Sequence, residues 1–437
     1  MKTAWFIALI SAICFEGLGR KYLPQIPAVA FYLIKDVILL FGYLRFRPPA
    51  YIGQVRAYLY RGFTIIWIVG FAWTVIELFN PAHASSALGL IGIRAYWLWW
   101  AAPPIIASVL ADEREKRRAI YVLLGTATLV SAFAALQFVS PSTSAFNIYS
   151  VVNGEEIGPT IVTATGRSRV SSTFSYISGF SNFTTLVPAL ILSLGLDARD
   201  RKLRRYALIA TCVTAAVLPM SGSRSSVVLG ALVLIIVAWT AGLLFTPVGR
   251  RIMIGGVAAA IVAVAVFPDA FAGVESRFQD IEETQGRFVA TAASVLPPVA
   301  LATFDYPALG IGTGMLQNAR IALGVSSPIE VEAEVARYLV ELGPFGFLLI
   351  WATKFGLVVA LLRAYMILKR GGRRGGAAAA LAYAFLTMLG NLAFDHIWQA
   401  LYFIGCGFIL AEVVSLLRAQ ALAKQAQEQA QQQPAAA

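Results

Sequence analysis

The sequence predicts an all-α, polytopic integral membrane protein with about twelve transmembrane helices. Of its 437 residues, 58% are hydrophobic and only 13% are charged, a composition outside the range of ordinary water-soluble domains. Apolar runs of about 17–25 residues recur along nearly the whole chain, each long enough to cross roughly 30 Å of hydrocarbon as a helix. The basic residues collect in short loops between these runs, which is typical of multi-pass membrane proteins.

The predicted spans follow one another from the N-terminal residues to residue 417. The first run, MKTAWFIALISAICFEGLG, is interpreted as a retained helix rather than a signal peptide, because it lacks a good A-x-A-like cleavage site. Cys14, Cys212 and Cys406 fall inside spans without disulfide or metal spacing and are interpreted as packing residues. The spans are residues 3–16, 25–44, 62–79, 87–110, 119–139, 172–195, 206–220, 225–244, 252–268, 339–362, 376–394 and 399–417.

Loops rich in lysine and arginine alternate with less basic loops along this succession. The basic loops are residues 45–61, 112–118, 199–205, 250–251 and 369–374. Positive-inside sorting places them in the cytoplasm together with both termini. The same sorting explains the net charge of +12, because the basic residues do not gather on one surface as nucleic-acid binding requires.

Two outer loops, residues 140–171 and 269–338, are long enough to carry function. The apolar stretch 288–304 is not predicted to be a span, because Pro297-Pro298 interrupts it and one more crossing would place the basic loop 369–374 outside. An interfacial helix from Gly286 to Leu296 is predicted instead. Residues 1–418 are therefore predicted to form one transmembrane domain, and the Gln/Ala-rich residues 419–437 are predicted to be a disordered or loosely helical cytoplasmic tail.

Arginines on the outer side are the strongest candidates for binding residues, since positive-inside sorting does not account for them. Arg224 lies in a short turn between two spans, where it either anchors a helix at the interface or binds phosphate through its fork of donors. Arg169 and Arg287 reach the same surface from the two long loops, although Arg287 could equally pair with a neighbouring glutamate, residue 282 or 283. Hydroxyl groups flank Arg224 at Ser221, Ser223, Ser225 and Ser226.

Acidic residues precede the tenth span. Residues 327–330 (SPIE) have the pattern of an N-cap, a first-turn proline and a capping-box glutamate, so a helix is predicted to begin there and to run into the span. By helical periodicity Glu334, Arg337 and Glu341 share a face, while Glu332 points roughly opposite. The shared face is either a salt-bridged, solvated stripe or the source of a general base beside the arginines.

Other ionisable residues have plainer interpretations. His83 and His396 lie in predicted outer loops and are interpreted as inert, unless Asp395 orients His396. Arg94, beside several aromatic residues, is interpreted as an interfacial anchor. The sequence has neither a Cys/His cluster nor a grouped acidic site, so no bound metal is expected. Charged residues within the spans, which keep a transporter interpretation open, are Lys35, Asp36 and Lys354.

Short motifs follow one another in order through the central and later parts of the chain. They are residues 169–174 (RVSSTF), 179–183 (GFSNF), 221–225 (SGSRS), 286–288 (GRF), 307–314 (PALGIGTG) and 341–346 (ELGPFG). With a large outer loop near the C-terminal end, this pattern resembles the O-antigen ligase and Wzy-type O-antigen polymerase family of bacterial envelope glycosyltransferases.

The resemblance implies metal-independent, inverting glycosyl transfer on the periplasmic face of the bacterial inner membrane, without a cofactor. It implies a glycan donor carried on undecaprenyl diphosphate, with a glycan or lipid acceptor, membrane lipids and polysaccharide export machinery as partners. The family arginines that hold the diphosphate would correspond to Arg224 and Arg287. Arg169 and Arg337 are further candidates for this role.

The chain departs from the family at the expected base. Ligases carry a His-Asn pair before the motif at 341–346, and Glu332 and Ala333 occupy the corresponding positions here. The base would therefore be Glu332 or Glu334, kept ionised by Arg337. The alternatives are a carrier or flippase for an anionic lipid-linked envelope precursor, which would use the arginines but no base, and a noncatalytic partner in an export assembly.

Overall fold

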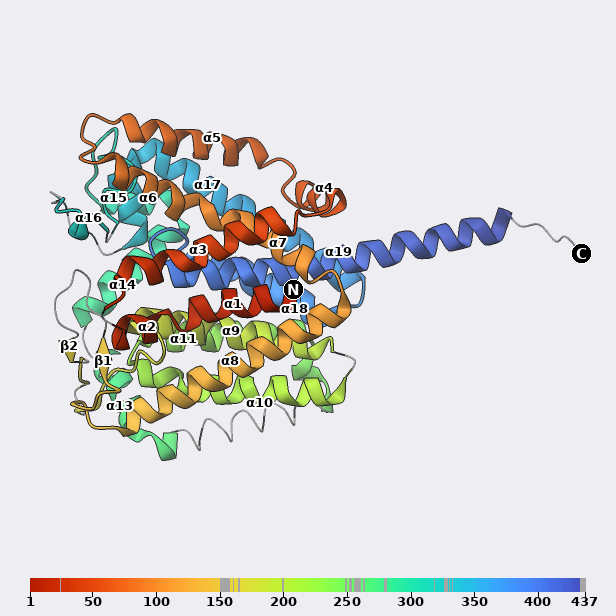
Figure 1. The fold of residues 1–437 in the computed structure, drawn as a ribbon, viewed down its shortest axis with the longest axis horizontal. Helices are drawn as coiled ribbons and strands as arrows, with labels where there is room; N and C mark the ends of the chain where they lie inside the picture. Colours follow the sequence, from red (N-terminus) through yellow and green to blue (C-terminus); the bar gives the residue numbers. More distant parts are fainter. Residues whose placement is uncertain are drawn as a thin grey trace, which may run out of the picture.

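The chain, seen in a computed structural model, is a bundle of helices from which the end of the last helix projects (Figure 1). The structure describes residues 1–23, 25–149, 158–159, 161–163, 166–198, 200–247, 250, 254, 261, 264–278, 281–317, 319–325, 329, 331 and 333–432. Within these ranges the predicted all-α class is confirmed. The one small sheet described pairs β1 (Ile148–Tyr149) with β2 (Gly158–Pro159) in antiparallel fashion.

The first half of the chain supplies one long helix and many shorter ones. They are α1 (Lys2–Cys14), α2 (Glu16–Tyr22), α3 (Ala28–Arg45), α4 (Ala50–Leu59), α5 (Thr64–Ile76), η1 (Glu77–Phe79), α6 (Ser86–Trp97), η2 (Leu98–Ala101), α7 (Ala102–Val109), α8 (Glu113–Val139), α9 (Ile177–Leu196) and α10 (Arg201–Val217). The 27-residue α8 begins at the N-cap Asp112, whose carboxylate accepts hydrogen bonds from the first-turn N–H groups.

The second half contains the helices that shape the site described below. They are η3 (Leu218–Ser221), α11 (Arg224–Thr240), η4 (Leu243–Phe245), α13 (Pro268–Phe278), α14 (Ile281–Val295), α15 (Pro297–Thr303), α16 (Ala319–Ala322), α17 (Glu334–Arg370), α18 (Arg374–Leu389) and α19 (His396–Gln432). The helix predicted over residues 286–296 is confirmed as part of α14, and the proline pair starts a new helix, α15.

Several helices have the length and composition of membrane spans. Five described helices meet both conditions: α8, α9, α10 with η3, α17 and α19. Two bent pairs, α1 with α2 and α4 with α5 and η1, raise the number to seven if each pair is one span. The pairs are bent by 54° and 94° respectively. The chain therefore has the architecture of a multi-pass membrane protein, with fewer qualifying helices than the twelve predicted.

The shortfall has physical causes. The run 87–110 is divided into α6, η2 and α7, because consecutive prolines begin α7. α11 and α18 have 17 and 16 residues, fewer than the roughly 20 that a typical span needs. α3 carries three charges, at Lys35, Asp36 and Arg45. The predicted span 252–268 lies mostly outside the described residues.

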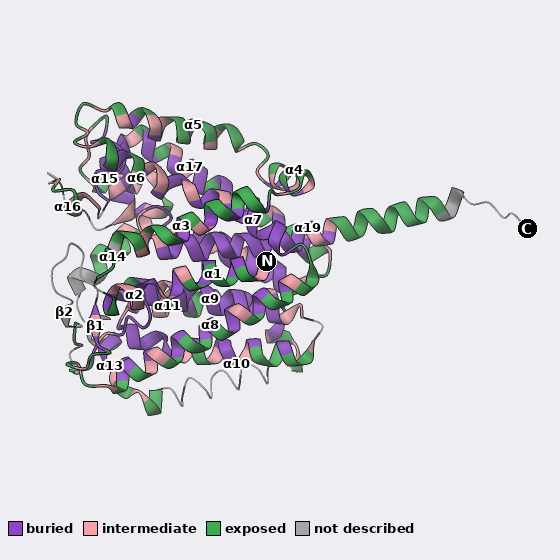
Figure 2. Ribbon diagram, viewed as in Figure 1, coloured by how far each residue is buried: buried purple, intermediate pink, exposed green. Residues whose placement is uncertain are grey.

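Buried residues concentrate in the middle of the bundle, along α9, α18 and the part of α19 that lies within it (Figure 2). Residues 418–429 of α19 are exposed, and the helix continues to Gln432. The end of the chain was predicted to be disordered or loosely helical from residue 419, and the structure has a helix over the described part of it. The helix follows from composition, because Ala, Gln, Lys and Glu all have high helix propensity.

α17 is broken at Gly343 and folds back on itself. Gly343 has φ 66° and ψ 177°, and Pro344 follows it without an N–H to donate. On a straight helix, residues 334 and 354 would lie about 30 Å apart. The Lys354 Nζ and Glu334 Oε2 atoms are in fact 3.6 Å apart. The first leg of α17, residues 334–342, therefore turns back beside the second leg, residues 344–370.

A glycine-rich loop, residues 307–314, packs against this break. The N–H groups of Ile311 and Gly312 donate to the carbonyls of residues 340 and 341 at 2.9 and 3.0 Å. The Glu341 carboxylate accepts hydrogen bonds from Gly314 N (3.0 Å), Leu316 N (2.6 Å) and the Tyr96 hydroxyl (2.9 Å). Glu341 is fully buried. The hypothesis that Glu334, Arg337 and Glu341 form a solvated stripe is thus wrong, because Glu341 is buried. The Glu341 carboxylate instead holds the glycine-rich loop against the break in α17.

This packing predicts a strong effect of a methyl group at Gly310. Gly310 has φ 78°, and a Cβ there would lie 2.4 Å from the Glu341 carbonyl oxygen. We expect Gly310→Ala to lose about 1–2 kcal/mol from the left-handed backbone and a further 1–3 kcal/mol from the overlap. Gly125→Ala is the control, because a Cβ at this exposed position in α8 meets nothing within 4 Å. Thermal unfolding should show the first variant destabilised and the second unchanged or stabilised; equal melting temperatures would contradict the packing.

Candidate functional site

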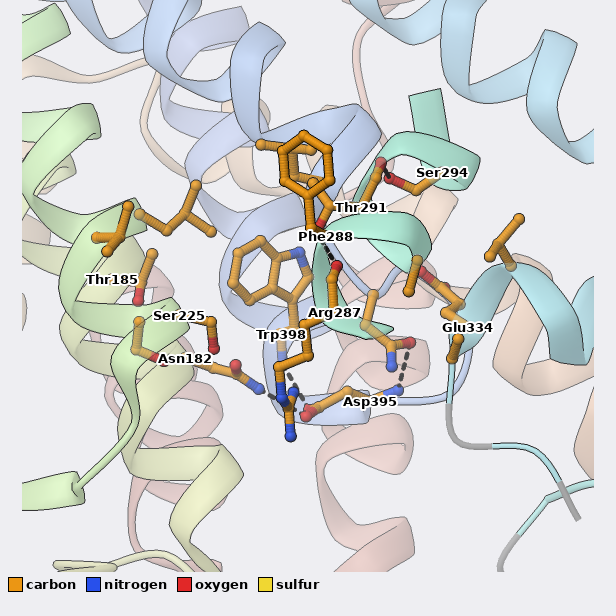
Figure 3. A pocket seen from close by; sticks show the side chains of 18 of the residues that line it. Asn182, Thr185, Ser225, Arg287, Phe288, Thr291, Ser294, Glu334, Asp395 and Trp398 are labelled. Carbon is orange, nitrogen blue, oxygen red and sulfur yellow. Dashed lines mark hydrogen bonds between the residues drawn. The ribbon is translucent and has the colours of Figure 1, made fainter. Parts of the chain in front are cut away.

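A cavity of 630 Å³ lies between helices that are far apart in the sequence (Figure 3). Its walls come from α9, α11, α14, both legs of α17, the end of α18, the segment that joins α18 to α19, and the first turn of α19. Part of the lining is apolar and includes Leu229, Leu232, Phe347 and Trp351. The polar part comprises Asn182, Thr185, Arg224, Ser225, Ser226, Arg287, Thr291, Ser294, Glu334, Lys354, Asn391 and Asp395. The cavity is thus suited to a ligand with one apolar and one polar end.

Arg224 reaches the cavity from the turn between η3 and α11. Gly222 adopts the left-handed conformation (φ 61°) that reverses the chain, and Ser223 is the N-cap of α11. Arg224 is the first helical residue and is only 6% exposed. Ser225 and Ser226 also line the cavity. The predicted grouping of a guanidinium with serine hydroxyls at a helix N-terminus is therefore present.

Arg287 enters the same cavity from α14. Figure 3 shows its side chain pointing toward Asn182 and Asp395, which belong to α9 and to the segment before α19. The glutamates proposed as alternative partners, at 282 and 283, have side chains outside the described set. Two of the predicted diphosphate-binding arginines, Arg224 and Arg287, thus face one cavity although different parts of the fold supply them.

Glu334 presents its carboxylate to this cavity at the start of α17. The carboxylate accepts hydrogen bonds from the Tyr338 hydroxyl and, at 3.0 Å, from the backbone N–H of Ala393. Lys354 Nζ lies 3.6 Å from the other oxygen and donates to the Gly390 carbonyl at 3.1 Å. The Glu334 side chain is 12% exposed. The hinge at Gly343 therefore brings a nearly buried, oriented carboxylate into the cavity that the two arginines also line, whereas Glu332 lies outside the described residues.

Arg169 lies behind the Arg224 turn rather than among the residues that line the cavity. Its Nε donates to the Ser221 carbonyl at 3.1 Å, and a Cβ at Gly222 would lie 3.0 Å from this nitrogen. The Tyr149 hydroxyl donates to the Arg169 carbonyl at 2.7 Å. Burial raises the pKa of the Tyr149 phenol above its usual range, so the phenol keeps the proton it donates. Arg169 thus braces the turn that presents Arg224.

Arg337 also lies outside the cavity lining, although it is on the same leg of α17 as Glu334. Its Nε donates to the Val331 carbonyl at 2.9 Å, and its guanidinium lies over the Phe394 ring at 5.3 Å from the centroid. The prediction that Arg337 holds the diphosphate is not supported by this placement, because its guanidinium is directed to the Val331 carbonyl and the Phe394 ring and is not among the groups that line the cavity.

Asp395 and Asn182 line the cavity and were not predicted as site residues. Asp395 Oδ1 caps α19 by accepting hydrogen bonds from the N–H groups of Ile397 (3.1 Å) and Trp398 (3.0 Å), and Oδ2 accepts from Asn182 Nδ2 at 2.6 Å. Asp395 therefore caps a helix and does not orient His396. The motif GFSNF at residues 179–183, noted for the family resemblance, contains Asn182, but nothing in the motif singled out this side chain.

Ionisable residues away from the cavity form buried pairs. Lys35 pairs with Glu16, and His396 Nε2 lies 2.9 Å from the other Glu16 oxygen. Arg94 pairs with Asp36, so it is a partner in a buried ion pair rather than an isolated interfacial anchor. These pairs tie α2, α3, α6 and the start of α19 together, because a buried charge needs an opposite charge close by.

His83 and the possible metal ligands are the remaining candidate site residues from the sequence. His83 Nε2 lies 2.9 Å from the Thr313 carbonyl oxygen, so it packs on the glycine-rich loop. Within the described ranges no three His, Cys, Asp or Glu side chains are grouped to hold a metal. Comparison of the chain with protein-family models and with curated protein sequences finds no match in either.

Proposed function

We propose that this protein is a glycosyltransferase that polymerises or ligates a saccharide carried on undecaprenyl diphosphate, in the manner of the O-antigen ligases and polymerases that its motifs resemble. The observation that carries the proposal is that Arg224, Arg287 and Glu334 line one cavity. Guanidinium groups bind phosphate oxygens through a rigid fork of donors, and a carboxylate beside them can accept a proton.

The two arginines would act on the leaving group. As the bond between the anomeric carbon and the phosphate oxygen breaks, its electron pair stays on the diphosphate, which gains negative charge. Preorganised donors in a cavity with little water stabilise that charge more in the transition state than in the ground state. Arg224, buried at the end of α11, is held in place before the donor arrives.

Glu334 would act on the acceptor. The acceptor hydroxyl oxygen forms the new bond to the anomeric carbon from the side opposite the diphosphate, which inverts the configuration, and its proton passes to the carboxylate. Glu334 is oriented for this step by Tyr338 and Ala393. The base would thus lie on the fold-back leg of α17, and Glu332 remains the other candidate.

The apolar lining would receive the lipid end of the donor. Leu229 and Leu232 follow Arg224 along α11, so the cavity grades from charged to apolar along one helix. This polarity fits a donor whose diphosphate lies near the outer surface of the inner membrane. The proposal includes twelve spans, periplasmic loops at 140–171 and 269–338, and both termini in the cytoplasm, as the basic loops indicate.

A transfer assay with the full chain in lipid nanodiscs tests the proposal. Undecaprenyl-diphosphate-linked oligosaccharides of defined sugar composition serve as donors and acceptors. We expect lengthened or transferred glycan and free undecaprenyl diphosphate in equal amounts, undiminished by a metal chelator. Absence of both products with every donor tested would contradict the proposed activity.

A carrier for an anionic lipid-linked precursor is the second candidate. The buried pairs Lys35 with Glu16 and Arg94 with Asp36 favour it, because ionisable residues within membrane helices often mark transport pathways. A carrier would move the intact donor across a vesicle membrane without forming glycan or free diphosphate. Glu334→Gln would leave that transport unchanged.

A further inference from the structure

The segment between α18 and α19, residues 390–395, forms one wall of the cavity and is fixed by surrounding side chains. Its Gly390 carbonyl accepts from Lys354, and its Leu392 carbonyl accepts from Gln399 Nε2 at 2.6 Å. Asn391 Oδ1 accepts hydrogen bonds from the N–H groups of Phe394 (2.9 Å) and Asp395 (3.0 Å). A short non-helical segment with this many hydrogen bonds holds the polar side chains it carries in defined positions.

Two amide side chains, Asn391 on this wall and Asn182 on the adjoining helix α9, each have polar atoms without a protein partner among the described residues. Asn391 Oδ1 accepts hydrogen bonds from the backbone, so the two N–H donors of Asn391 Nδ2 remain available to a ligand. Asn182 Nδ2 donates to Asp395, so the acceptor Asn182 Oδ1 remains available to a ligand. Both residues are half-buried and line the cavity. The two side chains therefore offer a ligand a fixed donor and a fixed acceptor.

These amides lie next to the arginine that would hold the diphosphate. Figure 3 shows Arg287 pointing toward Asn182 and Asp395. Glu334 lies on the Asn391 side of the pair, because its carboxylate accepts from the N–H of Ala393, two residues along the chain. A group bound at the amides therefore lies beside the arginine that would hold the diphosphate and beside the carboxylate that would act as the base. In a lipid-diphosphate-linked saccharide, that position belongs to the first sugar of the donor.

We propose that Asn182 and Asn391 form a subsite for the first sugar of the donor and select an uncharged ring with hydroxyl or acetamido substituents. This inference rests on the proposed function, because it takes the donor to be a lipid-linked saccharide. Each such substituent presents one donor and one acceptor, as the two amides do. A carboxylate on this sugar is disfavoured, because Asp395 lies 2.6 Å from Asn182 and would repel it.

Binding to the full chain in nanodiscs tests the subsite without requiring transfer. The probes are undecaprenyl diphosphate, undecaprenyl-diphosphate-linked N-acetylglucosamine and undecaprenyl-diphosphate-linked glucose. We expect wild type to bind at least one saccharide-linked probe about 3- to 10-fold more tightly than the bare lipid, the gain from one or two neutral hydrogen bonds. The preferred saccharide distinguishes an acetamido from a hydroxyl contact.

Two variants separate recognition from folding. Asn182→Ala removes the free acceptor. Asn391→Ser keeps an uncharged side-chain oxygen that can accept from the backbone and removes the amide donor. Each should bring the saccharide-linked and bare probes toward equal affinity and leave the bare probe unchanged, whereas Arg287→Ala should weaken all three. Equal wild-type affinity for the three probes, or equal losses for all probes in the asparagine variants, overturns the subsite. A saccharide preference in a protein that transfers nothing would contradict only the proposed activity.

Discussion

Alanine in place of Arg287 or Arg224 is expected to lower the rate of saccharide transfer by about 10²- to 10³-fold, the usual loss when one preorganised donor to developing negative charge is removed. Both side chains line the cavity, and Arg224 is nearly buried at a helix start. Lysine should restore only part of the rate, because an ammonium cannot match the two-pronged contact of a guanidinium with phosphate. The measurement is the single-turnover release of undecaprenyl diphosphate at saturating donor.

Arg205→Ala is the matched control. This exposed arginine lies in the first turns of α10, whose other end meets the η3 turn beside Arg224. The length of the helix places Arg205 more than about 20 Å from the turn that carries Arg224, and Arg205 does not line the cavity. Its loss should leave transfer at the wild-type rate. Undiminished transfer by both Arg224→Ala and Arg287→Ala would show that these arginines do not stabilise the leaving group. An equal loss of rate in Arg205→Ala would lead to the same conclusion.

The sequence located these two arginines because charge on the outer side of a membrane protein is rare and needs a reason. That reasoning requires only hydropathy and the order of the loops. It identified Arg169 by the same criterion, yet Arg169 braces the η3 turn instead of lining the cavity. Hydropathy and loop order predict a side of the membrane for each arginine, whereas the direction of one side chain depends on tertiary contacts.

The asparagine and aspartate beside Arg287 were beyond such reasoning. Asn182 and Asp395 are 213 residues apart, and their hydrogen bond exists only because α9 and α19 pack together in the bundle. Lys354 was noted as a charge within a span, but its partner was not. Nothing in the local pattern indicates that a lysine in the middle of one helix meets a glutamate at the start of the same helix.

The break in α17 explains that failure. Gly343-Pro344 marks an interruption, because proline lacks an N–H and glycine tolerates positive φ, but the sequence predicted a helix running on into the span. The direction of the fold-back is set by residues 307–314, whose backbone docks on residues 340 and 341. A contact between segments about thirty residues apart cannot be inferred from helical periodicity, which describes neighbours within a few turns.

Glutamine in place of Glu334 is expected to lower kcat for transfer by about 10²- to 10⁴-fold, the contribution of a general base. The substitution is nearly isosteric, and the amide oxygen can still accept from Ala393 and Tyr338. The proton acceptor is lost while the shape of the cavity is kept. Binding of undecaprenyl diphosphate should stay within about twofold of wild type, because this binding depends on the arginines, whereas the Glu334 carboxylate contacts Tyr338, Ala393 and Lys354.

Glu428→Gln provides the comparison, because this exposed glutamate lies near the projecting end of α19 and pairs with Lys424 on its own helix. Its transfer rate should equal that of wild type. Wild-type kcat in Glu334→Gln would move the base to another residue, with Glu332→Gln as the next variant. If Glu334→Gln and Glu332→Gln both move the intact donor across the membrane without forming glycan, the result would instead favour the carrier. A carrier needs the arginines to hold the diphosphate but needs no group to accept a proton.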